Sequence, residues 1–452
     1  MNEKQNEPLI FFSNSDLKLL IIPLFIEQIL AISVGMIDTM MISYAGEAAI
    51  SGVALVDLIN VLLINVFAAI ATGGAVVTSQ YLGKGDRKRC CESANQLILV
   101  TAVISLGIMV FILVLKRSFL TLLYHSISDD VMENALTYLR ISAYSYPFLA
   151  IFNSCAALFR SMGNSKISMK VSLAMNVMNI LGNAVLIFGF DMGIAGAAWA
   201  STASRIMASL VLFYLVQDQK NTIYVVPKDI FKWNGVLVRK ILYIGIPGGI
   251  ESGLFQLGRV VVVAIIANFG TVQIAANAVA NNLDNMGCIG GQAMNLAMVA
   301  VIGRCIGAKD YAQVKYYVKK MMKITYVLGT LTNGLVLITM PLILKVYSLS
   351  PETAGLAVIL VLIHCGLGII MWPPAFTLPN ALRAAGDVKI TMGISVFSMF
   401  VFRIVFSVIL GIYCGMGAVG VWIAMIFDWI FRLTMFAWRY RSGKWKEIHL
   451  VG

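Results

Sequence analysis

Long apolar segments recur at nearly regular intervals along this chain, from Leu17 to Trp438. Short stretches rich in glycine, proline and charged residues separate them. Each segment has about 20 residues or more, the length a helix needs to cross the hydrocarbon core of a bilayer. The pattern predicts about twelve transmembrane helices. Their approximate spans are 17–44, 52–81, 93–115, 132–160, 168–190, 193–217, 239–268, 276–303, 317–347, 353–382, 391–413 and 416–440.

Composition agrees with an all-α polytopic membrane protein. The 452 residues are 59% hydrophobic and only 12% charged, whereas a soluble protein has about 25% charged residues. The net charge of +12 comes from basic residues spread over many loops, so we expect no nucleic-acid partner. The first sixteen residues are mostly polar, which argues against a cleavable signal peptide. The seven cysteines show neither a disulfide framework nor metal-ligand spacing.

The two halves of the chain repeat one another. Pro23 and Glu27 have counterparts at Pro247 and Glu251, and the numbering differs by 224 in both pairs (247 − 23 and 251 − 27). The loop Gly83-Lys-Gly-Asp matches Gly307-Ala-Lys-Asp at the same spacing. A repeat at half the chain length indicates a duplicated membrane protein.

This repeat predicts two six-helix lobes around a central cavity, residues 1–217 and 239–452, the second with a short cytoplasmic tail. A cytoplasmic linker, 218–238, joins them. Six helices is an even number, so both lobes run in the same direction, with a pseudo-two-fold axis along the membrane normal. Lysine and arginine concentrate in alternate loops, which places both termini in the cytoplasm of a multi-pass protein of the cell (inner or plasma) membrane.

Two carboxylates lie in the first apolar segment. Glu27 and Asp38 are eleven residues apart, which puts them on nearly the same helix face and about 16 Å apart along the axis. Acids inside a membrane helix are usually functional because they are costly to keep there. The alternative is that either acid lies at a helix end and touches lipid headgroups.

An amide stripe marks the fifth segment. Asn176, Asn179 and Asn183 are spaced i, i+3, i+7 and share one face. They can form a polar site, or they can bond neighbouring helices, which contributes roughly 0.6–2 kcal/mol per bond.

The second half carries several charges of its own, and we expect most to be structural ion pairs, because an unpaired charge there is costly. They are Glu251, Asp284, Asp428, Arg259, Arg403 and Arg432. Arg205 in the first half is expected to pair similarly. Glu251 and Gln256 are candidate contacts for a cationic substrate or a coupling ion. His364 is expected to be a packed helix residue, and the Trp372-Pro-Pro run to kink the tenth helix.

The order and spacing of the motifs resemble the multidrug and toxic compound extrusion (MATE) family of transporters over essentially the whole chain. The motifs are IDTMMIS, YLGKGD, LFRSMGNSK, NVMNILGNAVLIFG, GIPGGIE, RAAGDVK and GVWIAMIFDW. The resemblance implies an antiporter that exports cationic or amphipathic drugs by alternating access, in exchange for Na⁺ or H⁺. It also implies a cation or proton site at Asp38, Asn179, Asn183 and Ser201.

Where many relatives carry an aspartate on the fifth helix, this chain has Asn183. Amide oxygens are ligands for a hard cation but take up no proton near neutral pH, which favours Na⁺ at Asp38, Asn179 and Asn183. A proton site on Asp38 is the alternative. In one branch of the family the seventh-helix acid lies one turn further on, near Gln256.

Two other functions compete with multidrug efflux. A lipid-linked oligosaccharide flippase of the same superfamily needs a strongly basic cavity. An intramembrane enzyme needs a catalytic cluster, and the three histidines are scattered along the chain. We therefore expect a non-enzymatic, monomeric transporter that works without a cofactor and contacts membrane lipids.

Overall fold

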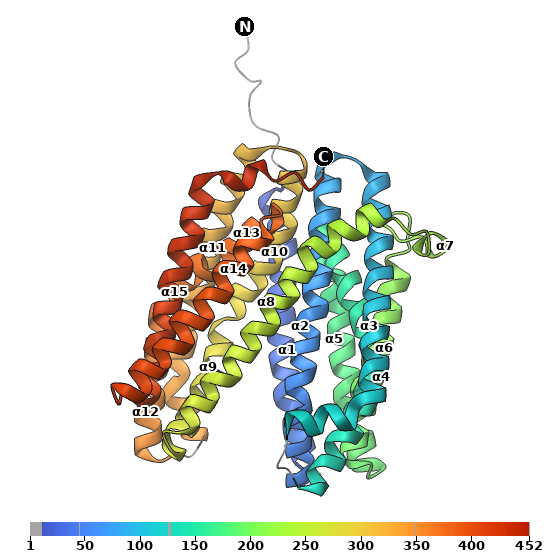
Figure 1. Ribbon diagram of the computed structural model, residues 1–452. Coiled ribbons are helices and arrows are strands. Elements are labelled where there is room, and N and C mark those ends of the chain that lie inside the picture. Colours follow the sequence, from blue (N-terminus) through green and yellow to red (C-terminus); the bar gives the residue numbers. More distant parts are fainter. Residues whose placement is uncertain (1–10, 45, 125–127, 348, 452) are drawn as a thin grey trace.

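The computed structural model describes residues 11–44, 46–124, 128–347 and 349–451 as a helical protein without strands in those ranges (Figure 1). The first half contains α1 (Asn14–Ser43), α2 (Glu47–Lys84), α3 (Arg87–Leu123), α4 (Asp129–Ser161), α5 (Ser165–Asn183) and α6 (Gly193–Leu215). The second half contains α8 (Gly235–Ala267), α9 (Thr271–Gly287), α10 (Ile289–Gly307), α11 (Tyr311–Val346), α12 (Pro351–Trp372), α13 (Leu378–Ala384), α14 (Val388–Phe397) and α15 (Gly417–Ser442). A short helix, α7 (Pro227–Ile230), lies in the connection between them.

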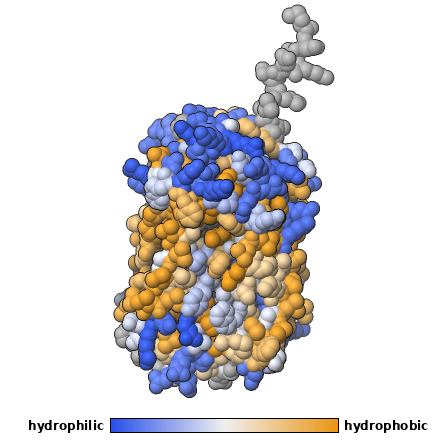
Figure 2. Space-filling model, turned by 90° about the vertical axis from the view of Figure 1, so that its right-hand side faces the viewer, coloured by the Kyte–Doolittle hydropathy of each residue, from blue (hydrophilic) through white to orange (hydrophobic). Residues whose placement is uncertain are grey.

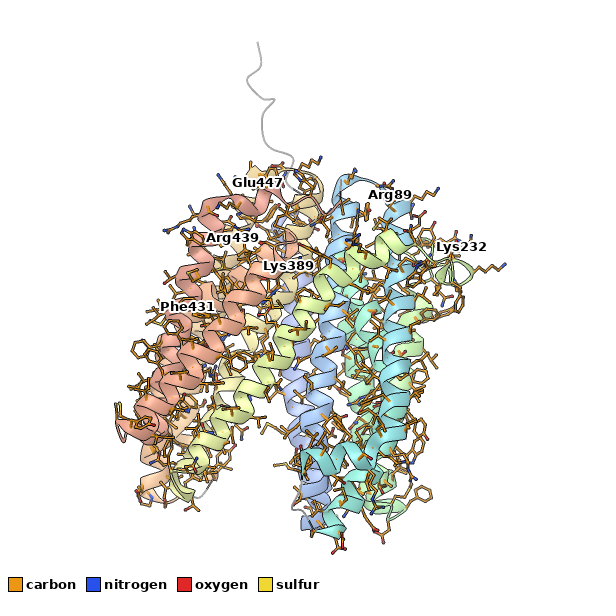
Figure 3. The ribbon with its side chains drawn as sticks, viewed as in Figure 1. Arg89, Lys232, Lys389, Phe431, Arg439 and Glu447 are labelled. Carbon is orange, nitrogen blue, oxygen red and sulfur yellow. The ribbon has the colours of Figure 1, made fainter. Side chains whose placement is uncertain are left out.

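Twelve helices in the described ranges are long and apolar enough to cross a membrane, as the hydrophobic pattern predicts. Their side chains form a hydrophobic band on the face shown in Figure 2, between a hydrophilic cap at the end bearing the termini and smaller hydrophilic areas at the other end. Arg89, Lys232, Lys389 and Arg439 all lie towards the end that bears the termini (Figure 3). The band and this basic end agree with a transmembrane protein.

Local polar residues set where the helices begin. Ser13 and Asp16 form a reciprocal capping box at the start of α1, and their side chains satisfy backbone N–H groups at 3.1 and 2.8 Å. Asp86 and Asp310 cap α3 and α11 by accepting from the backbone N–H three residues later, at 3.1 and 3.0 Å. The numbers of these two capping residues again differ by 224 (310 − 86), so the duplication extends to the helix ends.

Backbone conformation repeats as well. Five pairs of residues at the repeat spacing adopt positive φ, a region that favours glycine. The pairs are Gly46 and Gly270, Gly85 and Lys309, Gly163 and Gly386, Asp191 and Gly415, and Gly193 and Gly417. The numbering differs by 223 in the third pair and by 224 in the others. The two non-glycine residues in this region, Asp191 and Lys309, stand where the other half has glycine. The turn geometry has therefore been kept although the residues differ.

The two halves meet through α2 and α10, which cross near the end that bears the termini. A side chain at Gly83 would overlap the carbonyl oxygen of Arg304, and one at Gly307 would overlap that of Gln80. These contacts are equivalent under the repeat, since 307 − 83 and 304 − 80 are both 224. The pseudo-symmetry axis therefore passes between two backbones in direct contact.

The first helix of each half also packs, at its beginning, against helices of the other half. The beginning of α8 packs in a core with α2, α3 and α4, and the beginning of α1 packs in a core with α10 and α11. Figure 1 shows α8 running from the first half towards the far end of the second. At the end away from the termini the ribbons of the two halves diverge.

Most helices begin a few residues before the predicted spans, and α3 extends from Arg87 to Leu123 rather than from 93 to 115. Three further details differ. The eighth transmembrane segment is divided at Cys288 into α9 and α10. The seventh begins at Gly235 rather than near 239, because the Asn234 side chain caps it. In the tenth, the expected interruption is a π-helical turn, Pro373–Thr377, that leads directly into α13. Proline lacks the N–H that would continue the regular ladder, which accounts for this turn.

Candidate functional site

A chain of hydrogen bonds joins α1, α5 and α6 within the first half. The Nδ2 of Asn183 donates to Oδ1 of Asp38 at 2.7 Å and to Oδ1 of Asn179 at 3.1 Å. The Nδ2 of Asn179 donates in turn to Oγ of Ser201 at 2.8 Å. The four residues expected to form a cation or proton site therefore lie together. Their role in ion binding stays a prediction.

This cluster has an unused acceptor. Asn183 is 1% exposed, and its Oδ1 has no hydrogen-bond partner in the part of the chain that the structure describes. A buried carbonyl oxygen without a partner is costly, and a cation is one group that can satisfy it. Exchanging the oxygen and nitrogen of the Asn183 amide by rotation would bring that oxygen beside the Asp38 carboxylate, where a bound cation could contact both.

Glu27 faces the same neighbouring helix as Asp38 but lies away from the cluster. Its carboxylate accepts from Ser168 at 3.4 Å and from Ser172 at 3.3 Å, both on α5. The Ser172–Glu27 and Asn183–Asp38 bonds have the same sequence separation, 145 residues, so α1 and α5 run side by side in one direction. The predicted shared face of the two acids is confirmed. Asn176 is buried, and no hydrogen bond connects its side chain to the cluster among the described residues.

Two charged residues near Asp38 were not singled out as part of this site. Asp57, on α2, interacts electrostatically with Asp38, as does Arg205 on α6. Acids inside membrane helices are usually functional, and this holds equally for Asp57, which interrupts an apolar segment. The sequence therefore offered a signal for Asp57. The expectation that Arg205 forms an ion pair is wrong for the described residues. Its Nη1 donates instead to Oγ of Ser145 at 2.9 Å.

A larger cavity of about 450 Å³ lies between α2 and the second half. Its charged lining residues are Glu251, Arg259, Arg383 and Arg432, and Gln256 also lines it. The two predicted contact residues of α8 therefore face one space. Glu251 is not free, because Arg383 donates to its Oε1 at 2.6 Å.

Asp284 and Asp428, the two acids of the second half that the sequence predicts to be paired, each have a basic partner, which confirms the expected pairing for them. Asp428 is fully buried and accepts from Nε of Arg432 at 2.8 Å, with Arg403 at 3.9 Å. Asp284 lies 2.5 Å from Nε2 of His364. His364 packs edge-on against Trp429, with ring centres 4.8 Å apart, so it is a packed residue that also pairs with an acid.

Asp284, Cys288 and His364 are close enough to share a metal ion, with candidate ligand atoms within 4.8 Å of one another. The contacts are better explained as hydrogen bonds. The Asp284–His364 distance of 2.5 Å is that of a short hydrogen bond, and Cys288 Sγ lies 3.3 Å from Asp284 Oδ1. Arg259 adds positive charge beside Asp284, which opposes a second cation.

Comparison with known proteins gives a consistent result. The sequence model of the MatE family matches residues 23–185 and 247–409, two stretches whose numbering again differs by 224. The chain is 29% identical over 433 residues to the uncharacterized transporter YisQ of Bacillus subtilis, covering 94% of this chain and 93% of that protein. It is 24% identical over 443 residues to the probable multidrug resistance protein NorM of Thermotoga maritima, covering 95% and 92%.

Solved structures share the fold. A MOP-superfamily transporter from Pyrococcus furiosus, described as having a binding pocket of reverse polarity, superimposes with a TM-score of 0.89 at 17% identity, and 96% of each chain is covered. An outward-facing multidrug resistance MATE family transporter of the MOP superfamily superimposes with a TM-score of 0.88 at 18% identity, again over 96% of each chain.

Proposed function

Because this chain belongs to the MatE family, we propose that it exports amphipathic drugs across the cell membrane in exchange for Na⁺, by alternating access. The names of its relatives support drug export, since the Thermotoga relative is described as a probable multidrug resistance protein. The cavity of about 450 Å³ between the halves is large enough for a drug-sized molecule.

The single observation that carries the coupling proposal is the arrangement around Asp38. One carboxylate, two amides and one hydroxyl from three helices converge there, and a buried amide oxygen of Asn183 is unused. Hard cations such as Na⁺ prefer oxygen ligands of this kind. Binding of Na⁺ would satisfy that oxygen and neutralise Asp38, and both changes alter how α1 packs on α5.

Alternating access is supported by the way the halves meet. Direct backbone contact between α2 and α10 lies near the end that bears the termini, and the ribbons diverge at the opposite end (Figure 1). The basic residues gather at the end with the termini, which favours a cytoplasmic location for it (Figure 3). We therefore propose that the two halves close against each other at the cytoplasmic end in this conformation. The working unit that we propose is a monomer.

Norfloxacin efflux tests the proposal. Cells or vesicles containing wild type, Asp38→Asn or the exposed control Asp191→Asn are given a Na⁺ gradient while the proton gradient is collapsed. We expect Na⁺-dependent efflux from wild type and the control and none from Asp38→Asn. Wild-type efflux that ignores Na⁺ would exclude Na⁺ coupling, and equal efflux from all three would exclude Asp38 from the mechanism.

A further inference from the structure

Arg259 is an arginine without a direct partner deep in a membrane helix. It lies eight residues before the end of α8, about 12 Å along the helix axis. Among residues 11–44, 46–124, 128–347 and 349–451, no side chain forms a hydrogen bond or ion pair with it. Asp284 is near enough to attract it, but that carboxylate is already paired with His364.

Arg259 is an exposed residue. It lines the large cavity and two adjoining hollows of about 180 and 40 Å³. Arginines in such positions usually mark a substrate or ion pathway.

Arg403 lines the same two hollows and is also incompletely satisfied. It lies 3.9 Å from Asp428, whose Oδ1 is already engaged by Arg432. The Nε of Arg403 is buried and has no acceptor among the described residues. Two guanidinium groups therefore have unused donors beside one small space. A planar oxyanion, which accepts two parallel N–H bonds from a guanidinium, is the ligand that matches them.

The duplication gives a second, independent reason to expect an anionic ligand beside Arg259 and Arg403. At the spacing of 224, Asp38 corresponds to Val262, Asn179 to Arg403 and Ser201 to Met425. Val262, Arg403 and Met425 all line the 40 Å³ hollow with Arg259. The second half thus retains the position of the first half's polar cluster but replaces its carboxylate and amide by an apolar side chain and a cation. The copy suits a ligand of opposite charge.

The aromatic side chains that line the cavity indicate that the ligand also carries aromatic rings. Phe255, one turn before Arg259, lines both the large cavity and the 180 Å³ hollow, as does Phe376. Phe376 stacks on Trp372 with ring centres 5.1 Å apart, and the guanidinium of Arg432 lies 5.2 Å from the Phe376 ring centre. Of the acids that the structure describes, Glu251 lines the large cavity, where Arg383 neutralises it, and Asp284 lines the 180 Å³ hollow, where it bonds to His364. A cation therefore finds no free carboxylate in this cavity.

We infer that Arg259 and Arg403 form an oxyanion subsite for the carboxylate of an amphipathic aromatic substrate, whose rings lie against Phe255 and Phe376. This rests on the proposed transport function and narrows its substrate class. It differs from the expectation that Glu251 and Gln256 contact a cationic substrate or a coupling ion. A phospholipid phosphate presents the same oxyanion chemistry, so the experiment must separate the two sources.

The test is equilibrium binding to the purified protein, with norfloxacin and norfloxacin methyl ester as probes. They share ring system and amine and differ only in the carboxylate. We expect wild type to bind the acid about 10- to 100-fold more tightly than the ester, since hydrogen bonds to charged groups have this strength. Arg259→Gln should remove that preference and Arg259→Lys should keep part of it, because a lysine retains the charge but not the planar fork.

Arg140→Gln, at an exposed position that lines none of these spaces, is the control and should keep the full preference. Repeating the measurement in phosphatidylcholine with and without phosphatidylglycerol separates the sources. Competition by phosphatidylglycerol in wild type but not in Arg259→Gln assigns the subsite to a lipid phosphate and overturns the substrate assignment.

Two other results would also overturn the proposed carboxylate subsite. One is equal affinity of wild type for the acid and the ester, and the other is a preference for the acid that remains in Arg259→Gln. The binding measurement needs no ion gradient, so failure of Na⁺-coupled norfloxacin efflux would leave its outcome unchanged.

Discussion

Asp428 neutralises two arginines inside the second half, so replacing it tests how ion pairs stabilise that half. The carboxylate is completely buried on α15. One oxygen accepts from Nε of Arg432 at 2.8 Å and from the hydroxyl of Ser398, and the other lies 3.9 Å from Arg403. Asp428→Asn keeps the shape of the side chain and removes the charge that neutralises two arginines.

The expected cost follows from these contacts. Breaking a buried ion pair by removing one partner costs about 3–5 kcal/mol. Part of this is offset, because Arg432 retains a bond to the carbonyl of Ser395 at 3.0 Å and lies 5.2 Å from the ring centre of Phe376. The asparagine oxygen can also still accept one bond. We therefore expect Asp428→Asn to lower the free energy of unfolding by about 2–4 kcal/mol.

Denaturant titration of the purified protein in mixed micelles measures this difference. Asp191→Asn, at an exposed turn, is the matched control and should change stability by less than about 0.5 kcal/mol. The double variant Asp428→Asn/Arg432→Gln should recover about 1–3 kcal/mol relative to the sum of the single variants. Recovery should be incomplete because Arg403 still lacks its counter-ion. If Asp428→Asn cost no more than the surface control, the assignment of this cluster as a stabilising network would be refuted.

Two further predictions concern the contact between α2 and α10 and the connection between the two halves. Gly307→Ala should destabilise the protein by about 1–3 kcal/mol in the same titration, because its Cβ would overlap the backbone of α2, whereas Gly334→Ala, with open space around it, should not. Arg87 donates three hydrogen bonds to carbonyls of the connection between the halves. Arg87→Ala should therefore speed tryptic cleavage after the exposed Lys220 several-fold, while Arg89→Ala leaves the rate unchanged. An unchanged cleavage rate for Arg87→Ala would contradict the view that these bonds hold the connection in place.

Much of the fold was accessible from the sequence because a bilayer imposes a simple constraint. Every spanning segment must be helical, apolar and about 20 residues long, so the hydrophobic pattern locates it. The grouping of Asp38, Asn179, Asn183 and Ser201 was accessible for another reason. The resemblance to MATE transporters supplied the partners, and helical periodicity placed the three asparagines on one face.

Other features could not be read from the pattern because they depend on tertiary contacts. The break at Cys288 is flanked by Gly287 and Gly291, which pack closely against Asn333 and Trp372, contacts that the sequence does not show. Arg205 has an acid in its electrostatic neighbourhood but bonds to a serine on α4, which depends on how α4 and α6 pack. The isolation of Arg259 is likewise invisible in sequence, since Arg403 and Arg432 have the same residue type and similar surroundings.

Comparing the two halves distinguishes features that both need for folding from side chains that can differ between them. Caps, positive-φ turns and the glycine contact between α2 and α10 recur at one spacing in both halves, because each fixes backbone geometry that both halves need. Side chains facing the interior obey no such constraint. Asp38 and Asn179 in one half correspond to Val262 and Arg403 in the other. A transporter with two equal cation sites would have kept the carboxylate in both copies. A carboxylate in one copy and an arginine in the other are expected if the first half binds the driving ion and the second binds the transported molecule.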